Sequence, residues 1–305
     1  MDEFTVNVFP DARVQRPAGV DASAARSSVD RSCYNVKGIA NASEHLERLF
    51  LRPIDRESKK TPESAPPSQA GYSCSLQLQG GGLAVPRYYG RAHFGPAAVD
   101  RTVHGDAVTM DFTGTLRAYQ ERAVQACEHV LRREHGCLLS AGCGTGKTIM
   151  ALALATRLGV RTAILVHKGF LLKQWVERIR HFVPGARVGV VEQSTNDMPA
   201  APDVAVCMIQ TVIRRHIAPT TVFDSVGLVV VDECHHVCAR SFATVLRSFP
   251  ARYRVGLTAT PDRRDGLGYA IPWLLGPLAA HVRRPPGAGR VVWHDAATDA
   301  KVVTD

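Results

Sequence analysis

Residues 140–148 of the 305-residue chain read Ser-Ala-Gly-Cys-Gly-Thr-Gly-Lys-Thr, and this stretch decides the fold. The apolar run at 137–139 predicts a buried strand before it, and the alanine- and leucine-rich run at 149–155 predicts a helix after it. Gly144 and Gly146 allow the backbone to curl so that successive N–H groups point at an anion, beside the positive end of that helix. A strand, a glycine-rich turn and a helix in this order predict a phosphate-binding loop.

The loop offers a residue for each part of a bound triphosphate. Lys147 would reach the β- and γ-phosphates and is a candidate catalytic residue, and Thr148 would ligate Mg²⁺. The usual spacing begins with glycine, and Ala141 takes that position, which mostly shapes the turn. The predicted cofactor-binding residues of the loop are Ala141, Gly142, Cys143, Gly144, Thr145, Gly146, Lys147 and Thr148.

Composition predicts a globular, intracellular protein. Hydrophobic residues make up 45% of the chain, and no apolar run approaches the roughly 18 residues that a membrane span needs. The start, Met-Asp-Glu-Phe, lacks the basic residues and apolar run of a secretory signal. We therefore expect no membrane partner, and the sequence leaves nucleus or cytoplasm open.

Cysteine usage and charge narrow the chemistry further. The eight cysteines include no C-x-x-C pair, which predicts reduced thiols. Residues 234–238 read Cys-His-His-Val-Cys, but residues so close in sequence cannot all converge on one tetrahedral zinc ion, so zinc is not expected. The net charge of +9 is compatible with a polyanionic partner and supports other observations only.

Changes in composition divide the chain into four predicted regions. Proline and glycine clusters mark the boundaries, and three glycines at 80–82 predict a hairpin between residues 73–79 and 83–89. The four predicted regions are a largely irregular region at 1–72 with a short helix at 41–52 and a linker at 53–71, a small β-containing module at 73–112, an α/β domain at 113–282, and a connector or tail at 283–305.

The domain at 113–282 shows helix and strand signals in alternation with short connections. This pattern is typical of a mostly parallel sheet flanked by helices. Several strands are continuous runs of Val, Ile and Leu, as expected for strands buried on both faces. The predicted strands are 137–140, 162–166, 187–191, 204–208, 227–231 and 253–257, and the predicted helices are 116–132, 146–158 and 170–182.

Two carboxylates follow one of these buried strands. The run 227–231 ends in Asp232 and Glu233, and parallel sheets bind ligands beyond the carboxyl ends of their strands, where the phosphate loop also lies. Asp232 is placed to hold Mg²⁺ directly or through water, and Glu233 to orient and deprotonate an attacking water. The predicted catalytic residues are thus Lys147, Asp232 and Glu233, and the predicted metal ligands are Thr148 and Asp232.

In this order the motifs resemble those of superfamily 2 helicases of the DExH type. The sequence Asp-Glu-Cys-His at 232–235 and the stretch Gly-Leu-Thr-Ala-Thr-Pro-Asp-Arg-Arg-Asp-Gly at 256–266 are similar to the XPB-type branch rather than to DEAD-box RNA proteins. Residues 85–90, Val-Pro-Arg-Tyr-Tyr-Gly, are similar to a segment of members from large DNA viruses. The resemblance, over residues 85–290, implies a RecA-like P-loop NTPase lobe that uses ATP and Mg²⁺ and drives movement along nucleic acid. DNA is the expected partner, and the sequence does not exclude RNA.

The resemblance also implies roles for residues outside the loop. Gln120 would read the adenine base with Arg117 near the nucleotide. His235, Thr258 and Thr260 would couple the nucleotide site to the nucleic acid. The residues implied to contact nucleic acid are Lys168, Gln174, Gln210 and Thr211. Alternatives stay open here: Lys168 suits a solvated surface, Gln210 and Thr211 suit a helix cap, and Trp175 suits core packing as well as base stacking.

One part of the implied family pattern is missing from this sequence. The second lobe of such helicases carries arginine fingers in a Q-x-x-G-R-x-x-R pattern, which does not occur here; residues 283–290 resemble a connector to that lobe or a flexible basic tail. Arginine fingers contribute about 10³ to 10⁵ in turnover in other P-loop NTPases. We therefore expect the chain alone to bind Mg-ATP and hydrolyse it slowly, with a second RecA-like lobe acting in cis or in trans. The alternative is a non-catalytic nucleic-acid-binding or regulatory module that keeps the lobe as a scaffold, and a nuclease or remodelling translocase ranks below both.

Overall fold

The computed structural model describes most of the chain in separate stretches. Three predictions lie outside the described residues: the linker at 53–71, the connector or tail beyond residue 283, and Thr260. The described stretches are residues 4–14, 26–30, 33–39, 41–51, 72–78, 82–192, 195–197, 202–214, 221–236, 240–259 and 266–283.

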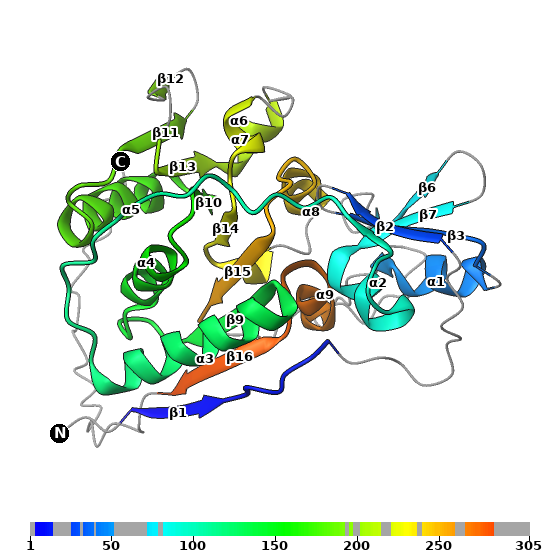
Figure 1. Ribbon diagram of the computed structural model, residues 1–305, viewed down its shortest axis with the longest axis horizontal. Coiled ribbons are helices and arrows are strands. Elements are labelled where there is room, and N and C mark those ends of the chain that lie inside the picture. Colours follow the sequence, from blue (N-terminus) through cyan, green and yellow to red (C-terminus); the bar gives the residue numbers. More distant parts are fainter. Residues whose placement is uncertain are drawn as a thin grey trace, which may run out of the picture.

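A large twisted sheet forms the centre of the described molecule (Figure 1). It runs, from one edge to the other, in the order β1 (Thr5–Val8), β16 (Leu278–Arg283), β9 (Gly136–Ala141), β15 (Tyr253–Thr258), β14 (Leu228–Val231), β10 (Thr162–Val166), β13 (Val204–Met208), β11 (Val188–Glu192) and β12 (Thr195–Asp197). The strands from β16 to β11 are parallel to one another, and β1 and β12 are antiparallel at the two edges.

Helices cover both faces of this sheet, as Figure 1 shows. On one face lie α3 (Ala118–Glu134), α4 (Lys147–Leu158) and α5 (Gly169–Phe182), which bury Met150, Trp175 and Ile179 against the strands. On the other lie α6 (Ile209–Arg214), α8 (Arg240–Leu246) and α9 (Ile271–Leu275), with the short α7 (Thr221–Asp224), η3 (Cys234–His236) and η4 (Leu267–Ala270) in the connections. The predicted α/β class with a mostly parallel sheet is confirmed.

The predicted strands of this sheet agree with the observed ones to within one residue at each end, and 162–166 and 204–208 coincide with β10 and β13. The strands β10, β13 and β14 are almost entirely buried, so their continuous apolar runs identify them. The sequence pattern predicts no strand at β1 or β16. Each of these strands is defined by a partner far away in the sequence, since β1 pairs with β16 in the register Val6 with Val282.

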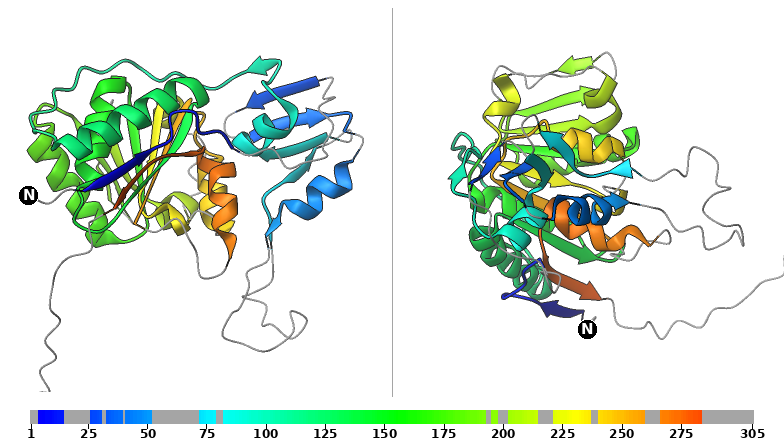
Figure 2. Two further views of the ribbon diagram at one scale, coloured as in Figure 1. Left: turned by 90° about the horizontal axis from the view of Figure 1, so that it is seen from below. Right: turned by 90° about the vertical axis from the view of Figure 1, so that its right-hand side faces the viewer.

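A smaller sheet lies beside the large one, as the left view of Figure 2 shows in blue and cyan. Its order is β6 (Leu76–Leu78), β7 (Gly82–Pro86), β3 (Cys33–Lys37), β2 (Arg26–Asp30) and β8 (Val99–Asp100), with α1 (Ala42–Arg48), α2 (Arg87–Phe94), and the pair β4 (Phe50–Leu51) and β5 (Tyr72–Ser73) around it. The region 1–72 is therefore not largely irregular where it is described. The strands in this region have no clear local sequence pattern because they are short and pair with distant segments, as β3 pairs with β7.

The hairpin predicted around the glycines at 80–82 forms between β6 and β7, but its second strand is shorter than expected. The strand ends at Pro86, and residues 87–94 are the helix α2. Proline has no N–H to continue a ladder, and α2 packs closely on β3. A Cβ at Gly90 would lie 2.2 Å from Cγ of Tyr34, so only glycine allows this approach.

The smaller sheet packs directly on the large one. Tyr89 of α2 contacts Trp273 of α9 with 5.0 Å between ring centroids, and both sheets contribute to one continuous hydrophobic cluster. Arg87 Nη1 donates hydrogen bonds to the carbonyls of Ala251, at 2.9 Å, and Arg252, at 3.0 Å. The smaller sheet is thus fixed to the loop that precedes β15. None of the helices in the described stretches has the length and apolar character that a bilayer crossing requires.

Candidate nucleotide-binding site

The predicted site residues gather at the carboxyl ends of the central strands of the large sheet because these strands are parallel. The phosphate loop follows β9, Asp232 follows β14, and β15 lies between these strands and ends at Thr258. The register pairs Thr258 with Ser140 and Val231 with Gly256, so the loop and the two carboxylates flank a single strand.

The phosphate loop has the backbone conformation that its glycines permit. Gly144 and Gly146 have φ angles of 75° and 88°, in the left-handed region. The hydroxyl of Thr145 closes the turn with a hydrogen bond of 2.7 Å to the carbonyl of Gly142. Lys147 begins α4, and its Nζ donates to the carbonyl of Ala141 at 3.0 Å. Thr148 is partly exposed in the first turn of α4, and Cys143 and Gly144 face solvent.

Gln120 joins α3 to this loop. Its Nε2 donates to the carbonyl of Thr145 at 3.0 Å, and its Oε1 accepts the backbone N–H of Arg117 at 2.9 Å. The hydroxyl of Tyr119 donates to the same carbonyl at 3.0 Å, and the ring of Phe4 stacks on Tyr119 with 4.3 Å between centroids. The structure therefore brings the predicted adenine-side residue to the loop, whereas the Arg117 side chain is exposed.

Asp232 is buried, with 7% of its surface exposed, and both carboxylate oxygens have donors. Oδ1 accepts the backbone N–H of Glu233 at 2.9 Å, and Oδ2 accepts the indole Nε1–H of Trp175 at 2.8 Å. Trp175 is 1% exposed, so of the two interpretations left open by the sequence the structure supports core packing and not base stacking. No pattern in the sequence predicts the bond to Asp232.

Glu233 lies beside the residues predicted to couple the two sites. Its φ of 48° is unusual for a residue with a side chain and turns the chain sharply after β14. Its Oε2 is 3.3 Å from Nδ1 of His235, and the Thr258 hydroxyl is 3.5 Å from that nitrogen. Burial raises the pKa of Glu233 and Asp232 adds to the rise, while the positive charge of Lys147 opposes it.

The donor set of this edge fits a triphosphate and Mg²⁺. The loop supplies backbone N–H groups and the Lys147 cation, which suit phosphate. The Thr148 hydroxyl and the Asp232 carboxylate are hard oxygen ligands of the kind that Mg²⁺ prefers. Glu233 is a carboxylate whose pKa is raised by burial, and a raised pKa suits a proton acceptor.

The residues implied to contact nucleic acid follow β10 and β13: Lys168 precedes α5, Gln174 lies within α5, and Gln210 and Thr211 lie in α6. Gln210 Nε2 donates to the carbonyl of His167 at 3.0 Å and so ties these two strand ends together. Lys168 and Gln174 are exposed, but Thr211 is only 5% exposed, so the structure buries one predicted contact residue. It also presents Phe170, which is 63% exposed, with Lys168 Nζ 5.8 Å from its ring centroid. The signal that could have found Phe170 is an aromatic residue at the start of the helix that follows a buried strand.

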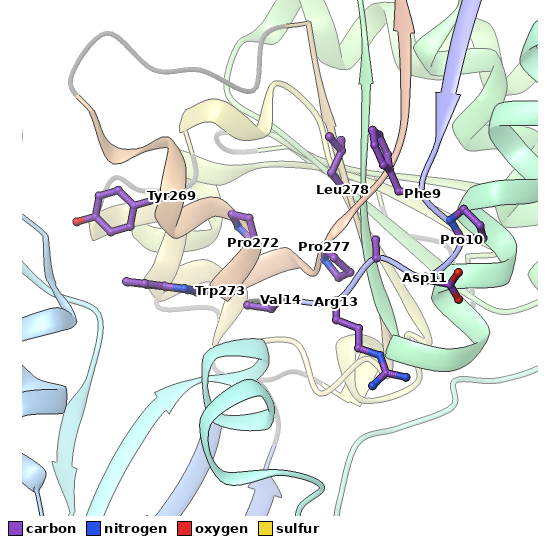
Figure 3. Close-up of a pocket in the computed structure, with 11 residues that line it drawn as sticks. Phe9, Pro10, Asp11, Arg13, Val14, Tyr269, Pro272, Trp273, Pro277 and Leu278 are labelled. Carbon is purple, nitrogen blue, oxygen red and sulfur yellow. The ribbon is translucent and has the colours of Figure 1, made fainter. Parts of the chain in front are cut away.

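A hollow of about 950 Å³ lies elsewhere, at the amino ends of the strands (Figure 3). Phe9, Tyr269, Trp273 and Leu278 line it, and none of the predicted site residues does. This hollow is therefore separate from the nucleotide site, which is formed by the phosphate loop and the carboxylates at the carboxyl ends of the parallel strands.

Residues 113–263 match the family model described as "Type III restriction enzyme, res subunit". This part of the chain is a superfamily 2 helicase domain. A protein of Acanthamoeba polyphaga mimivirus, assigned by name to the ATP-dependent RNA helicases (L396), is 30% identical to the chain over 198 residues. The "DNA 3'-5' translocase XPB2" of Sulfurisphaera tokodaii is 34% identical over 170 residues. Viral and XPB relatives confirm the resemblance that the motifs predicted.

The part that matches this chain covers less than half the length of each of these two relatives. The mimivirus match covers 64% of this chain and 38% of that protein, and the XPB2 match covers 53% and 35%. The solved structure of the UvsW helicase from bacteriophage T4 has a TM-score of 0.54 at 14% identity, covering 83% of this chain and 99% of that one. Since the match extends over more of the chain than residues 113–305, it includes part of residues 1–112 as well as the helicase domain. Helicases of this family use ATP with Mg²⁺ and hydrolyse it.

Proposed function

We propose that this lobe binds Mg-ATP at residues 141–148 and couples ATP hydrolysis to movement along nucleic acid. The nucleic acid in this proposal is DNA. The observation that carries the proposal is the convergence of the phosphate loop and the pair Asp232–Glu233 on the same end of β15. Lys147 is near enough to Glu233 to affect the pKa of that carboxyl, so the phosphate-binding cation and the proposed base share one site.

Each residue at this edge then has a distinct task. The loop N–H groups and Lys147 bind the phosphates, and Thr148 and Asp232 hold the metal ion. Bound Mg²⁺ supplies charge neutralisation at the phosphates. Glu233 orients the attacking water and accepts its proton, helped by a pKa already raised by burial.

The same edge supports a nucleic-acid surface. Lys168, Gln174 and Gln210 are exposed at or after the ends of β10 and β13, where a cation and amides can bind the sugar–phosphate backbone without reading sequence. Phe170 adds an exposed ring on which a base can stack. His235 contacts both Glu233 and Thr258, and His235 and Thr258 lie between this surface and the phosphate loop. Thr260 belongs to the same proposed coupling motif by its sequence position.

The site is completed in this proposal by a second RecA-like lobe, in cis or in trans. Its arginines would face the phosphates opposite Lys147. Because such arginines contribute about 10³ to 10⁵ in turnover, the lobe alone should bind nucleotide and turn it over slowly.

The test compares Lys147→Ala with Lys37→Ala, an exposed lysine of the smaller sheet. Nucleotide affinity is measured on the chain itself, and DNA-stimulated ATP hydrolysis is measured with a polypeptide carrying a second lobe. The proposal requires that Lys147→Ala weakens binding and abolishes hydrolysis while Lys37→Ala changes neither. Unchanged hydrolysis in Lys147→Ala would refute it, and the absence of hydrolysis with any second lobe would favour a non-catalytic scaffold.

A further inference from the structure

The indole of Trp175 is a direct link between two parts of the site that the proposed function keeps separate. Its Nε1–H donates to Oδ2 of Asp232 at 2.8 Å, across 57 residues of sequence. Trp175 belongs to α5, the helix that begins beside Lys168 and Phe170, whereas Asp232 follows β14. One hydrogen bond therefore connects the helix of the proposed nucleic-acid surface with the proposed metal ligand.

The geometry leaves this bond little freedom. Leu172, Trp175 and Ile179 share one face of α5 and are 3%, 1% and 0% exposed. They fix the rotation of the helix about its axis, so the indole points at the carboxylate and cannot turn toward solvent. From Phe170 to Trp175 the helix advances about 8 Å, which places the exposed ring and the buried indole on the same short rigid segment.

The hydrogen bond from Trp175 affects how the Asp232 carboxylate is oriented toward a metal ion. A carboxylate offers about four lone-pair positions. One oxygen accepts the Glu233 N–H from the turn itself, and the other accepts the indole N–H from α5. These two donors set the plane of the carboxylate and leave its remaining lone pairs for metal-bound water. Partners of this kind commonly change metal affinity or activity by about 10- to 100-fold when removed.

We propose that Trp175 is a positioning residue that couples nucleic-acid binding to ATP hydrolysis: a shift of α5 on binding at Lys168 and Phe170 is transmitted through the indole N–H to the carboxylate of Asp232. The inference rests on the proposed function and adds a route to it. A core tryptophan with a merely structural role would stabilise the fold without reporting on the metal ligand or on nucleic acid.

The first test uses Trp175→Phe, which keeps an aromatic ring and removes the N–H donor. The matched control is Trp273→Phe, whose ring packs between Tyr89 and Tyr269 away from the site. In the assembly with a second lobe, the DNA-stimulated kcat of Trp175→Phe should fall by about 10-fold or more, and by more than the unstimulated kcat, while KM for ATP and the Kd for single-stranded DNA change less than about threefold. A stimulation ratio equal to that of the wild type would overturn the proposal.

The second test needs no turnover. The chain has three tryptophans, so the double variant Trp273→Phe, Trp293→Phe leaves Trp175 as the only emitter. Its fluorescence should change when Mg²⁺ with a non-hydrolysable ATP analogue is added, and also when oligo-dT is added without nucleotide. Adding Asp232→Ala should alter the starting spectrum and abolish both responses. If the fluorescence of Trp175 does not change when oligo-dT is bound, the proposed coupling through Trp175 is wrong. If no assembly hydrolyses ATP the proposed function fails, whereas this emission test still decides whether α5 reports to Asp232.

Discussion

The side-chain amide of Gln120 and the carbonyl oxygen of Thr145 lie 3.0 Å apart, so the start of α3 is bonded directly to the phosphate loop. The second end of the same amide accepts the N–H of Arg117, at the first turn of α3. Gln120 therefore both begins a helix and shapes the loop, independently of any contact with a base.

Replacing Gln120 by alanine should weaken nucleotide binding by about 2- to 10-fold, as expected for one lost hydrogen bond to the loop. The free energy of unfolding should fall by about 1 kcal/mol because the Arg117 N–H loses its cap. Calorimetric titration with ATP and chemical denaturation measure the two effects. Gln125→Ala is the control, since that exposed glutamine donates a hydrogen bond to Glu121 on the same helix. Equal nucleotide affinities in both variants would contradict this role.

Gly146→Ala should prevent nucleotide binding and destabilise the lobe. The residue has a φ of 88°, and its Cβ would lie 2.4 Å from Gln120 Nε2. A left-handed backbone costs an L-residue about 1–2 kcal/mol, and the clash displaces the amide that holds Thr145. Thermal unfolding and nucleotide titration are the measurements. Gly185→Ala, where a Cβ meets nothing within 4 Å, should leave both unchanged; a wild-type affinity in Gly146→Ala would show that the loop does not need this conformation.

Glu233→Gln should lower ATP hydrolysis by about 10²- to 10⁴-fold and leave nucleotide affinity nearly unchanged, because the amide keeps the shape and loses the base. In the wild type, burial raises the pKa of Glu233 above its ordinary 4.5. Hydrolysis should therefore decline as pH falls through that raised value, where the carboxyl becomes protonated. Single-turnover rates across acidic pH measure both effects, and a flat acid limb in the wild type would argue against Glu233 as the base.

His135 should make stability depend on pH. It caps α3, accepts a hydrogen bond of 2.8 Å from Arg252 Nη2, and has its pKa lowered to about 4 by burial and by the charges of Arg252 and Arg91. The unfolded chain, with an ordinary value of 6.5, binds a proton more readily over this interval. The free energy of unfolding should thus fall as pH drops from about 6.5 to 4 and level off outside it.

Urea denaturation at several pH values checks this expectation. His135→Gln keeps an acceptor for Arg252 and should flatten the dependence in that interval. His129→Gln, at an exposed position of the same helix, should retain it. An unchanged slope in His135→Gln would assign the pH dependence to other groups.

Phe170→Ala should weaken binding of single-stranded DNA by about 5- to 100-fold, the range expected when one base loses an aromatic stacking partner. Fluorescence anisotropy of a labelled oligonucleotide measures the affinity. Phe9→Ala is the matched control because Phe9 is also exposed, at 41%. It lies by the hollow at the amino ends of the parallel strands, away from Phe170. If the two variants bind equally well, the base-stacking role of Phe170 is wrong.

The sequence predicts those parts of this molecule that local physics determines. The buried strands β10, β13 and β14 are continuous apolar runs, and the glycines at 144 and 146 mark the loop, so both could be located with their boundaries. Pairing between distant segments leaves no such local signal. For that reason the sequence predicts no strand at β1, β2 or β3, and it predicts strand at residues 87–89, which are the first three residues of α2. The close packing of α2 on Tyr34, far away in sequence, leaves no local signal.

The candidate site shows the same division. Lys147, Thr148, Asp232 and Glu233 could be chosen because their chemistry follows recognisable strand ends, and the structure brings them to one edge. The burial of Thr211 and the bond from Trp175 to Asp232 depend on how α5 and α6 pack on the sheet. Their individual roles stay predictions until the variants above are measured.

The pairing of β1 with β16 bears on how this lobe can be handled in the laboratory. The family match begins at residue 113, yet the outermost parallel strand is sealed by residues 5–8, and Phe4 rests on Tyr119 beside the phosphate loop. A fragment cut at the start of the match would expose the bare edge of β16, a template for pairing with another chain. The lobe's working unit is discontinuous in sequence, and a soluble minimal version requires its first strand to be retained.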